Sequence, residues 1–86
     1  MATHSPAPWA KNLRIIEDAN GEEIARLSYE RSGYVQANGH LIAAAPDLLA
    51  VAGGCLGYLE ALPDEARPDE EWLAPLRAAI AKAKGA

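Results

Sequence analysis

The fold of this chain depends most on the stretch Asn12-Leu-Arg-Ile-Ile-Glu-Asp-Ala-Asn-Gly-Glu-Glu-Ile-Ala-Arg-Leu-Ser-Tyr29. Its Asn20-Gly21 pair separates two halves that are rich in Ile and Leu. An Asn-Gly pair between two such halves is typical of a β-hairpin, because both residues tolerate the positive φ that a tight turn requires. We therefore predict two antiparallel strands here, so that the fold contains a sheet.

The register of this hairpin can be predicted from the side chains that each turn would bring opposite one another. A two-residue turn at the Asn-Gly pair would place Ile15 opposite Arg26 and mix apolar with charged side chains. A three-residue loop with Gly21 in the left-handed region would place Ile15 opposite Ala25 and gather the apolar side chains on one face. We predict the three-residue loop, because a buried apolar face fixes the register of a strand.

The segments on either side of the hairpin carry weaker signals. Pro6 and Pro8 disfavour a helix, so we expect residues 1–10 to form an extended N-terminal arm that Trp9 anchors. After the hairpin and a turn, residues 34–36 are expected to add a short third strand.

Helical signals fill the second half of the chain. Asn38 is a preferred N-cap residue, and we expect it to begin a short helix at residues 39–45. Pro46 favours a bend there, followed by a longer helix at 46–62. A last helix follows a loop, and its apolar face comprises Trp72, Leu73, Leu76, Ala79, Ile80 and Ala83.

The longer helix carries two stripes of different character. Apolar residues at three- and four-residue spacing predict its core face, namely Leu48, Ala52, Cys55 or Leu56, Leu59 and Leu62, with Leu49 and Val51 widening it. The other stripe consists of the small residues Ala50, Gly53, Gly54, Gly57 and Ala61. Each interior glycine costs about 1 kcal/mol relative to alanine, so we interpret this stripe as an interface where a second subunit of a homo-oligomer approaches closely. A local bend at Gly53-Gly54 is the alternative interpretation.

The apolar character of this region raises the question of a membrane span. Asp47 is the only charge between Leu41 and Leu59, and a helix that is apolar almost all round is normally buried on every side. Pro46, Glu60 and three glycines interrupt the stretch. We therefore predict a core helix of a soluble protein, with its cysteine buried, and expect no membrane partner.

Length and composition limit the remaining classes. With 86 residues, 9.1 kDa, no Phe and 50% hydrophobic residues, we expect residues 11–86 to form a single domain with an aliphatic core. Its class is α+β, with a small antiparallel β-hairpin or three-stranded sheet packed on two or three helices. A net charge of -4 with scattered bases argues against nucleic-acid binding.

The residue types that chemistry requires are scarce. One cysteine and two histidines provide neither a disulfide nor a metal site, and no nucleophile has a base at workable spacing. We therefore expect no enzyme, no catalytic residue, no metal and no cofactor. No basic and apolar leader begins the sequence, which favours a cytoplasmic protein.

One segment has the residues to bind a ligand. It brings Arg31, Tyr34, Asn38 and His40 close to the predicted helix N-terminus, where free backbone amides favour an anion. Arg31 would supply charge-assisted hydrogen bonds and Tyr34 a stacking face. The alternative is that Asn38 is a plain helix cap and that the other three residues are ordinary strand or surface residues.

Two motifs resemble a family of small bacteriophage and prophage proteins. The first, Asn38-Gly-His-Leu-Ile-Ala-Ala-Ala-Pro-Asp-Leu-Leu49, is similar to the Ala-Asn-Ala-Arg-Leu-Ile-Ala-Ala-Ala-Pro-Asp/Glu-Leu-Leu core of that family, except that Gly39-His40 replaces Ala-Arg. The second, His4-Ser-Pro-Ala-Pro-Trp9, resembles its His-Thr-Pro-Gly-Pro-Trp start, with Ala7 in place of Gly. The ending Arg77-Ala-Ala-Ile-Ala-Lys-Ala-Lys-Gly85 is also similar.

The resemblance implies a phage context and no particular chemistry. Small phage proteins often counter host defence, which favours an oligomer that sequesters a small anionic, nucleotide-like immune signal in the cytoplasm of the host bacterium. The first alternative is an inhibitor that binds a host defence protein, such as a CRISPR effector, through its acidic edge at residues 64–71. The second alternative is a structural or assembly protein of the virion.

Overall fold

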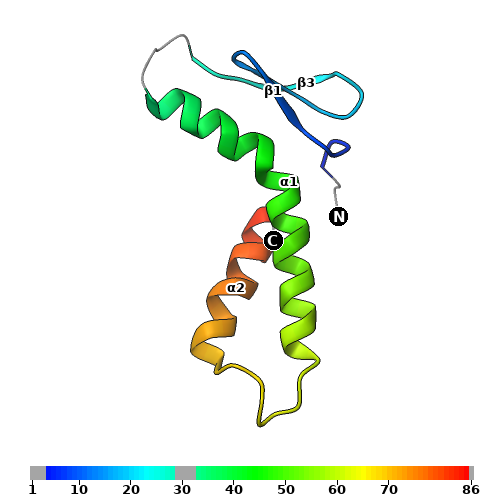
Figure 1. Ribbon diagram of the computed structural model, residues 1–86, viewed down its shortest axis with the longest axis vertical. Coiled ribbons are helices and arrows are strands. Elements are labelled where there is room, and N and C mark those ends of the chain that lie inside the picture. Colours follow the sequence, from blue (N-terminus) through cyan, green and yellow to red (C-terminus); the bar gives the residue numbers. More distant parts are fainter. Residues whose placement is uncertain (1–3, 29–32, 86) are drawn as a thin grey trace. The chain divides into compact units, whose positions relative to one another are not determined.

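The computed structural model describes residues 4–28 and 33–85, which form three strands followed by two helices (Figure 1). The elements are β1 (Ala10–Asn12), β2 (Ile15–Glu17), β3 (Glu23–Arg26), α1 (Gly33–Glu60) and α2 (Glu70–Ala83). The chain folds as two compact units that divide inside α1, unit 1 (Met1–Asp47) and unit 2 (Leu48–Ala86). The predicted α+β class, with an antiparallel sheet and helices, is confirmed.

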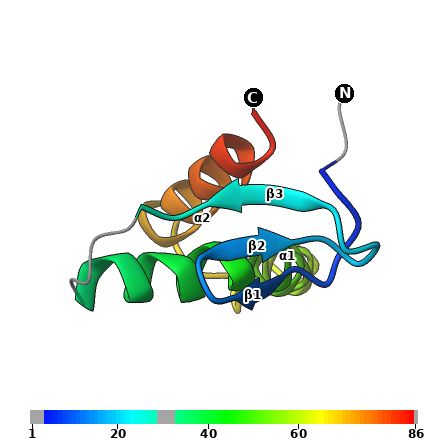
Figure 2. The ribbon, with the colours of Figure 1, turned by 90° about the horizontal axis from the view of Figure 1, so that it is seen from above.

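The sheet of unit 1 has the order β1-β2-β3, with both pairs antiparallel (Figure 2). The β2–β3 loop is the predicted one, because the amide of Asp18 donates to the carbonyl of Glu22 at 2.9 Å and Gly21 has a φ of 81°. The buried carboxylate of Asp18 also accepts from the amides of Asn20 and Glu22, at 2.9 and 3.0 Å. The side chain of Asp18 therefore stabilises the loop, because its carboxylate accepts hydrogen bonds from loop amides in place of backbone carbonyls.

The predicted register is wrong beyond this loop. A bulge between Ile16 and Glu17 shifts the pairing by one residue, so that Ile16 lies opposite Ala25 and Ile15 opposite Arg26. A bulge adds a residue to one strand and turns the following side chains to the other face. Ile16 therefore becomes the fully buried residue of the sheet.

The third strand lies elsewhere than predicted. β1 pairs with β2 across a turn at Leu13-Arg14, in which Leu13 has a φ of 57°. Residues 34–36, predicted as a strand, belong to the first turns of α1. The turn was missed because a leucine seldom adopts positive φ, so no Gly or Asn-Gly signal marks it.

Helix α1 is one continuous element and begins earlier than predicted. It starts at Gly33, so Asn38 lies inside it and is not its N-cap, and it contains Pro46 without ending there. Proline removes one backbone hydrogen bond from a helix, which a helix of 28 residues tolerates. The predicted separate helices at 39–45 and 46–62 are therefore a single helix.

Helix α1 meets the sheet within unit 1 at Gly39, which is buried. A Cβ atom added there would lie 2.6 Å from Cδ1 of Leu27 and 2.8 Å from Cε of Lys11. Leu27 and Ile16 are the buried apolar side chains of this unit. The arm also joins the sheet, since the amide of Ala19 donates to the carbonyl of Pro6 at 3.0 Å.

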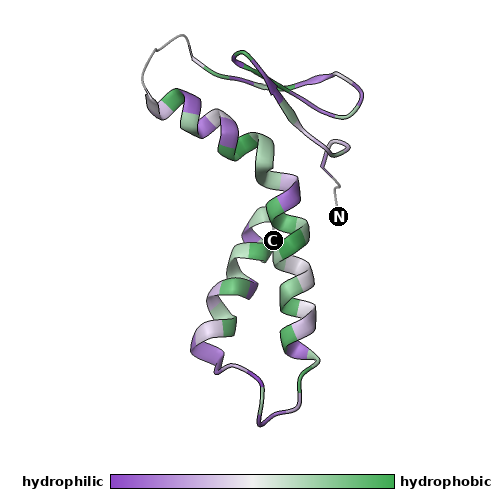
Figure 3. Ribbon diagram, in the orientation of Figure 1, coloured by the Kyte–Doolittle hydropathy of each residue, from purple (hydrophilic) through white to green (hydrophobic). Residues whose placement is uncertain are grey.

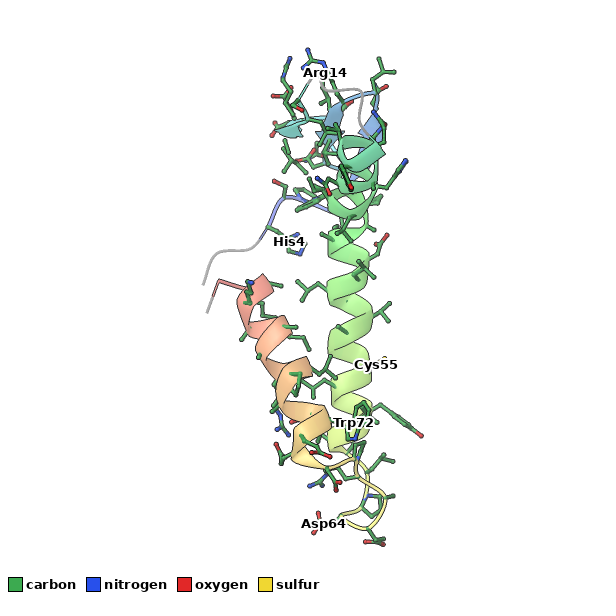
Figure 4. The ribbon with its side chains drawn as sticks, turned by 90° about the vertical axis from the view of Figure 1, so that its left-hand side faces the viewer. His4, Arg14, Cys55, Asp64 and Trp72 are labelled. Carbon is green, nitrogen blue, oxygen red and sulfur yellow. The ribbon has the colours of Figure 1, made fainter. Side chains whose placement is uncertain are left out.

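Unit 2 is a helical hairpin made by the second half of α1 and by α2, which lie side by side (Figures 1 and 4). Leu73 and Ile80 of the predicted α2 face are buried, whereas Trp72 is exposed. Arg77 of α2 joins the elements through ion pairs with Glu60 at 2.9 Å and Glu70 at 2.5 Å. The hydrogen bonds that Arg77 donates to the carboxylates of Glu70 and Glu60, in that order of size, raise the pKa of its guanidinium above the ordinary value.

Within a single chain the central helix is not buried on every side, so the predicted full burial is not made by the chain's own described residues. Figure 3 shows that hydrophobic residues predominate along the second half of α1. Much of this apolar surface is exposed, including Leu48, Val51, Tyr58 and Cys55, whose thiol was predicted to be buried. One partner helix can cover only one side of another, so the remaining circumference of α1 stays open.

Candidate functional site

The residues predicted for ligand binding do not form one cluster. Arg31 lies outside the described residues. Tyr34, Asn38 and His40 are all exposed on α1. At about 100° per residue, Tyr34 and Asn38 share one side of the helix, while His40 lies on a different side. Because α1 begins at Gly33, the free amides of its first turn lie near Tyr34 and not near Asn38 or His40.

The small residues predicted as an interface lie on the open surface of unit 2. Ala50, Gly53, Gly54, Gly57 and Ala61 are all exposed. No atom of the described chain comes within 4 Å of a Cβ added at any of the three glycines, outside their own helical surroundings. The close approach that this stripe was expected to permit is therefore not made within residues 4–28 and 33–85.

A pocket of about 430 Å³ lies in unit 1, where the β1–β2 turn faces the start of α1. Its lining consists of Lys11, Asn12, Leu13, Arg14, Ile15 and Gln36. Two of these side chains are cationic and two are amides, while the leucine and isoleucine provide apolar surface. This combination suits a small ligand with an anionic group and an apolar or ring portion.

The fold fixes the cationic side chains of this pocket. The stem of Lys11 packs over Gly39, and Nη1 of Arg14 donates to the carbonyl of Leu27 at 3.4 Å. Asn12 is held by Glu17, whose Oε1 accepts from Nδ2 at 3.3 Å. Backbone and side-chain contacts therefore orient the polar groups before any ligand arrives, which reduces the entropy cost of binding.

Sequence reasoning missed this pocket because it depends on a turn that carries no recognisable signal. Lys11 and Arg14 are three residues apart, a spacing that would not bring them together on a continuous strand. The tight turn at Leu13-Arg14 and the packing of α1 at Gly39 bring both into one lining with Gln36. The signal that could have found it is the pair of cations close to the hairpin segment.

A second, apolar hollow of about 400 Å³ lies on α1 in unit 2 and is lined by Val51, Gly54, Cys55, Tyr58 and Leu59. Its lining contains no charged side chain. In length and composition α1 passes the test for a helix able to cross a membrane, a test that the core helices of soluble proteins also pass.

Neither a cluster of metal ligands nor a fully unpaired acidic edge is found among the residues that the structure describes. Within the described ranges, no three His, Cys, Asp or Glu side chains lie together as metal ligands would. On the predicted acidic edge, Asp64 pairs with Arg67 at 3.2 Å and Glu70 pairs with Arg77. These acids are therefore partly neutralised by neighbours in their own unit.

Comparison with known proteins gives one result. A family model described as Salmonella phage P22 protein Y8K6 matches residues 1–86. No curated protein and no solved structure matches the chain. The match confirms the predicted relationship to a family of phage proteins.

Proposed function

Because the chain belongs to the family of Salmonella phage P22 protein Y8K6, we propose that it is a phage accessory protein that binds a small anionic, nucleotide-like signal and withholds it from host defence. The observation that carries this proposal is the pocket of unit 1, which joins Lys11 and Arg14 to an apolar surface. The protein acts by binding, without turnover, in the cytoplasm of the host bacterium.

The chemistry of the pocket supports this class of ligand. A phosphate group accepts charge-assisted hydrogen bonds from Lys11 and Arg14. A base or sugar ring covers Leu13 and Ile15, while Asn12 and Gln36 offer amide donors and acceptors to its edges. A volume of about 430 Å³ lies in the range of small-molecule sites.

Two cationic side chains in the pocket also contribute a substantial part of the binding free energy that the proposal requires. Each charge-assisted hydrogen bond contributes about 1.5–3 kcal/mol, so two cations supply roughly 3–6 kcal/mol towards the roughly 8 kcal/mol of a micromolar affinity, and the apolar contact supplies the remainder and offsets the cost of association. The predicted ligand residues Tyr34 and His40 are absent from the lining, so they serve as comparison sites on the same unit.

Titration calorimetry tests the proposal. The full chain is titrated with a panel of cyclic nucleotides and ADP-ribose derivatives, and we expect one member to bind with a Kd in the micromolar range or below. Lys11→Gln and Arg14→Gln each weaken this binding about 10-fold or more, because each removes a charge while keeping most of the side chain. The ligand is recovered chemically unchanged, as binding without turnover requires.

Three matched variants give the controls. Tyr34→Ala and His40→Ala retain the affinity if the ligand binds in the pocket. They lose it if the ligand binds at the residues that were predicted from the sequence. Arg26→Gln removes a cation from β3 that pairs with Glu23 outside the pocket, and it leaves binding unchanged. Absence of binding across the panel, or equal losses in all the cation variants, contradicts the proposal.

A further inference from the structure

The bulky side chains of α1 in unit 2 form two neighbouring stripes. The first comprises Leu49, Ala52, Leu56 and Leu59, which are all half-buried in the unit that also contains α2. The second comprises Leu48, Val51, Cys55 and Tyr58, which are all exposed. The second stripe, here called the outer seam, is displaced by one residue from the first, or about 100° around the helix.

The spacing of the outer seam is that of a coiled coil. Its members follow one another at intervals of three, four and three residues, which is the 3.5-residue repeat of helices that pair lengthwise. A helix that only covers a globular core shows one broader apolar face. The first stripe is already partly covered within unit 2, so the outer seam is a second, exposed surface available for pairing.

The apolar hollow lies on this seam. Four of its lining residues, Val51, Gly54, Cys55 and Tyr58, stand at relative positions 0, 3, 4 and 7. Four such residues form the hole that receives a side chain from a facing helix in knobs-into-holes packing. Gly54 has no side chain and open space beside it, which enlarges the hole on one side.

We propose that the outer seam pairs with the outer seam of a second copy of the chain. The pattern is self-complementary, because one seam offers both the protruding side chains and the hole that receives them. Its four members are uncharged, so two copies meet without repulsion between like charges. Two helical hairpins that join in this way form a four-helix bundle, in which α1 is covered on both of its bulky stripes.

The exposed bulky side chains supply part of the area that a dimer buries. Tyr58 is 70% exposed, which leaves about 140 Å² of its side chain to bury. Leu48 and Val51, 53% and 65% exposed, add about 60 Å² each, and Trp72 of the same unit, 73% exposed, offers about 150 Å² to a bundle. These four side chains provide about half of the roughly 800 Å² that a standard interface takes from each partner.

Lipid fits this helix less well than a second copy does. A helix that lies alone in lipid carries bulky apolar side chains around its circumference, whereas small residues spaced by four, such as Gly53 and Gly57, occur in membrane helices where a second helix packs closely. In α1, the side opposite the outer seam carries Ala50, Gly53 and Gly57, and Glu60 is held in an ion pair with Arg77. The bulk is therefore confined to the two stripes that two partner helices can cover.

Sedimentation velocity of the full chain tests the pairing. Between about 5 and 100 μM, the wild type is expected to shift from 9.1 kDa towards twice that mass. Val51→Glu and Tyr58→Glu each raise the dissociation constant about 100-fold, because each buries an unpaired charge against its symmetry mate. Both residues are exposed in the single chain, so circular dichroism is expected to show the wild-type helix content.

Cys55 supplies a second readout that does not depend on mass. It is the only cysteine in the sequence and it is exposed in the single chain, so pairing along the seam covers its thiol (Figure 4). Its reaction with Ellman's reagent is expected to slow about 10-fold from low to high protein concentration. Val51→Glu restores the fast reaction at all concentrations.

Ala50→Glu is the matched control, since it adds the same charge one residue away on the stripe of small residues. It is expected to leave the dimer intact. A wild type that stays at 9.1 kDa up to 100 μM overturns the proposal. The proposal is also overturned if Ala50→Glu dissociates the dimer while the Val51→Glu variant remains dimeric. Flotation of the wild type with phosphatidylglycerol vesicles, abolished by Val51→Glu, would assign the seam to lipid and also overturn it.

The proposed pairing and the proposed ligand binding are tested independently of each other. Calorimetry with the nucleotide panel reports on the pocket of unit 1, whereas mass and thiol protection report on unit 2. Loss of one result leaves the other standing.

Discussion

Glycines at two places on α1 have opposite surroundings. Gly39 in unit 1 is buried, and a Cβ there would lie 2.6 Å from Leu27 and 2.8 Å from Lys11. Gly53, Gly54 and Gly57 in unit 2 face open space within the part of the chain that the structure describes. The comparison shows that a run of glycines in a helix does not by itself identify the glycine that packing requires. In α1, the glycine at which a side chain would meet neighbouring atoms is the isolated Gly39.

Enlarging Gly39 is expected to have the largest effect on stability. Gly39→Val forces its side chain into Leu27 and the stem of Lys11, and overpacking of this kind costs about 1–3 kcal/mol. Urea denaturation followed by the fluorescence of Trp9, in a Trp72→Phe background, measures the loss in unit 1. An unchanged midpoint would show that α1 does not pack on the sheet at Gly39.

Filling the open glycines is expected to have a smaller effect of opposite sign. Gly53→Ala stabilises unit 2 by about 0.5–1 kcal/mol, because alanine loses less backbone entropy in a helix and its methyl group meets no neighbour. Thermal melts by circular dichroism measure the change. A lower melting temperature at low protein concentration would mean that Gly53 has a close neighbour, and the contrast with Gly39 would fail.

Removing the ion pairs of unit 2 is expected to have the smallest effect. Arg77→Gln lowers the melting temperature slightly, because Arg77 pairs with Glu60 and Glu70 at a partly exposed site where water and salt screen the charges. The difference from the wild type shrinks as NaCl is raised. An effect that is insensitive to salt would show that the stem of Arg77 matters by packing.

Prediction from sequence succeeded where a local signal had a single physical cause. The Asn20-Gly21 pair and its left-handed Gly21 predicted the β2–β3 loop, because few residues accept that conformation. The α2 face was found in part, since Leu73 and Ile80 follow the helical period and are buried. The α+β class follows from these two segments together.

Prediction failed where contacts distant in sequence decide the structure. The bulge after Ile16 and the turn at Leu13-Arg14 carry no composition signal, yet they determine which isoleucine is buried and add a strand. Asn38 is a good cap, but the helix begins five residues earlier and places it in the interior. A local preference worth about 1 kcal/mol is overridden when a longer helix makes more hydrogen bonds.

The candidate binding pocket shows the same limit most clearly. Its residues lie in two separate stretches, and only the packing of α1 at Gly39 brings Gln36 to Lys11 of β1 and Arg14 of the following turn. By itself the sequence determined the α+β class, the β2–β3 loop and the apolar periods of the helices, because these depend on near neighbours. Only the tertiary structure decided which stripe of α1 is partly buried, which stripe is left exposed, and where cations gather, because those depend on which surfaces exclude water from one another.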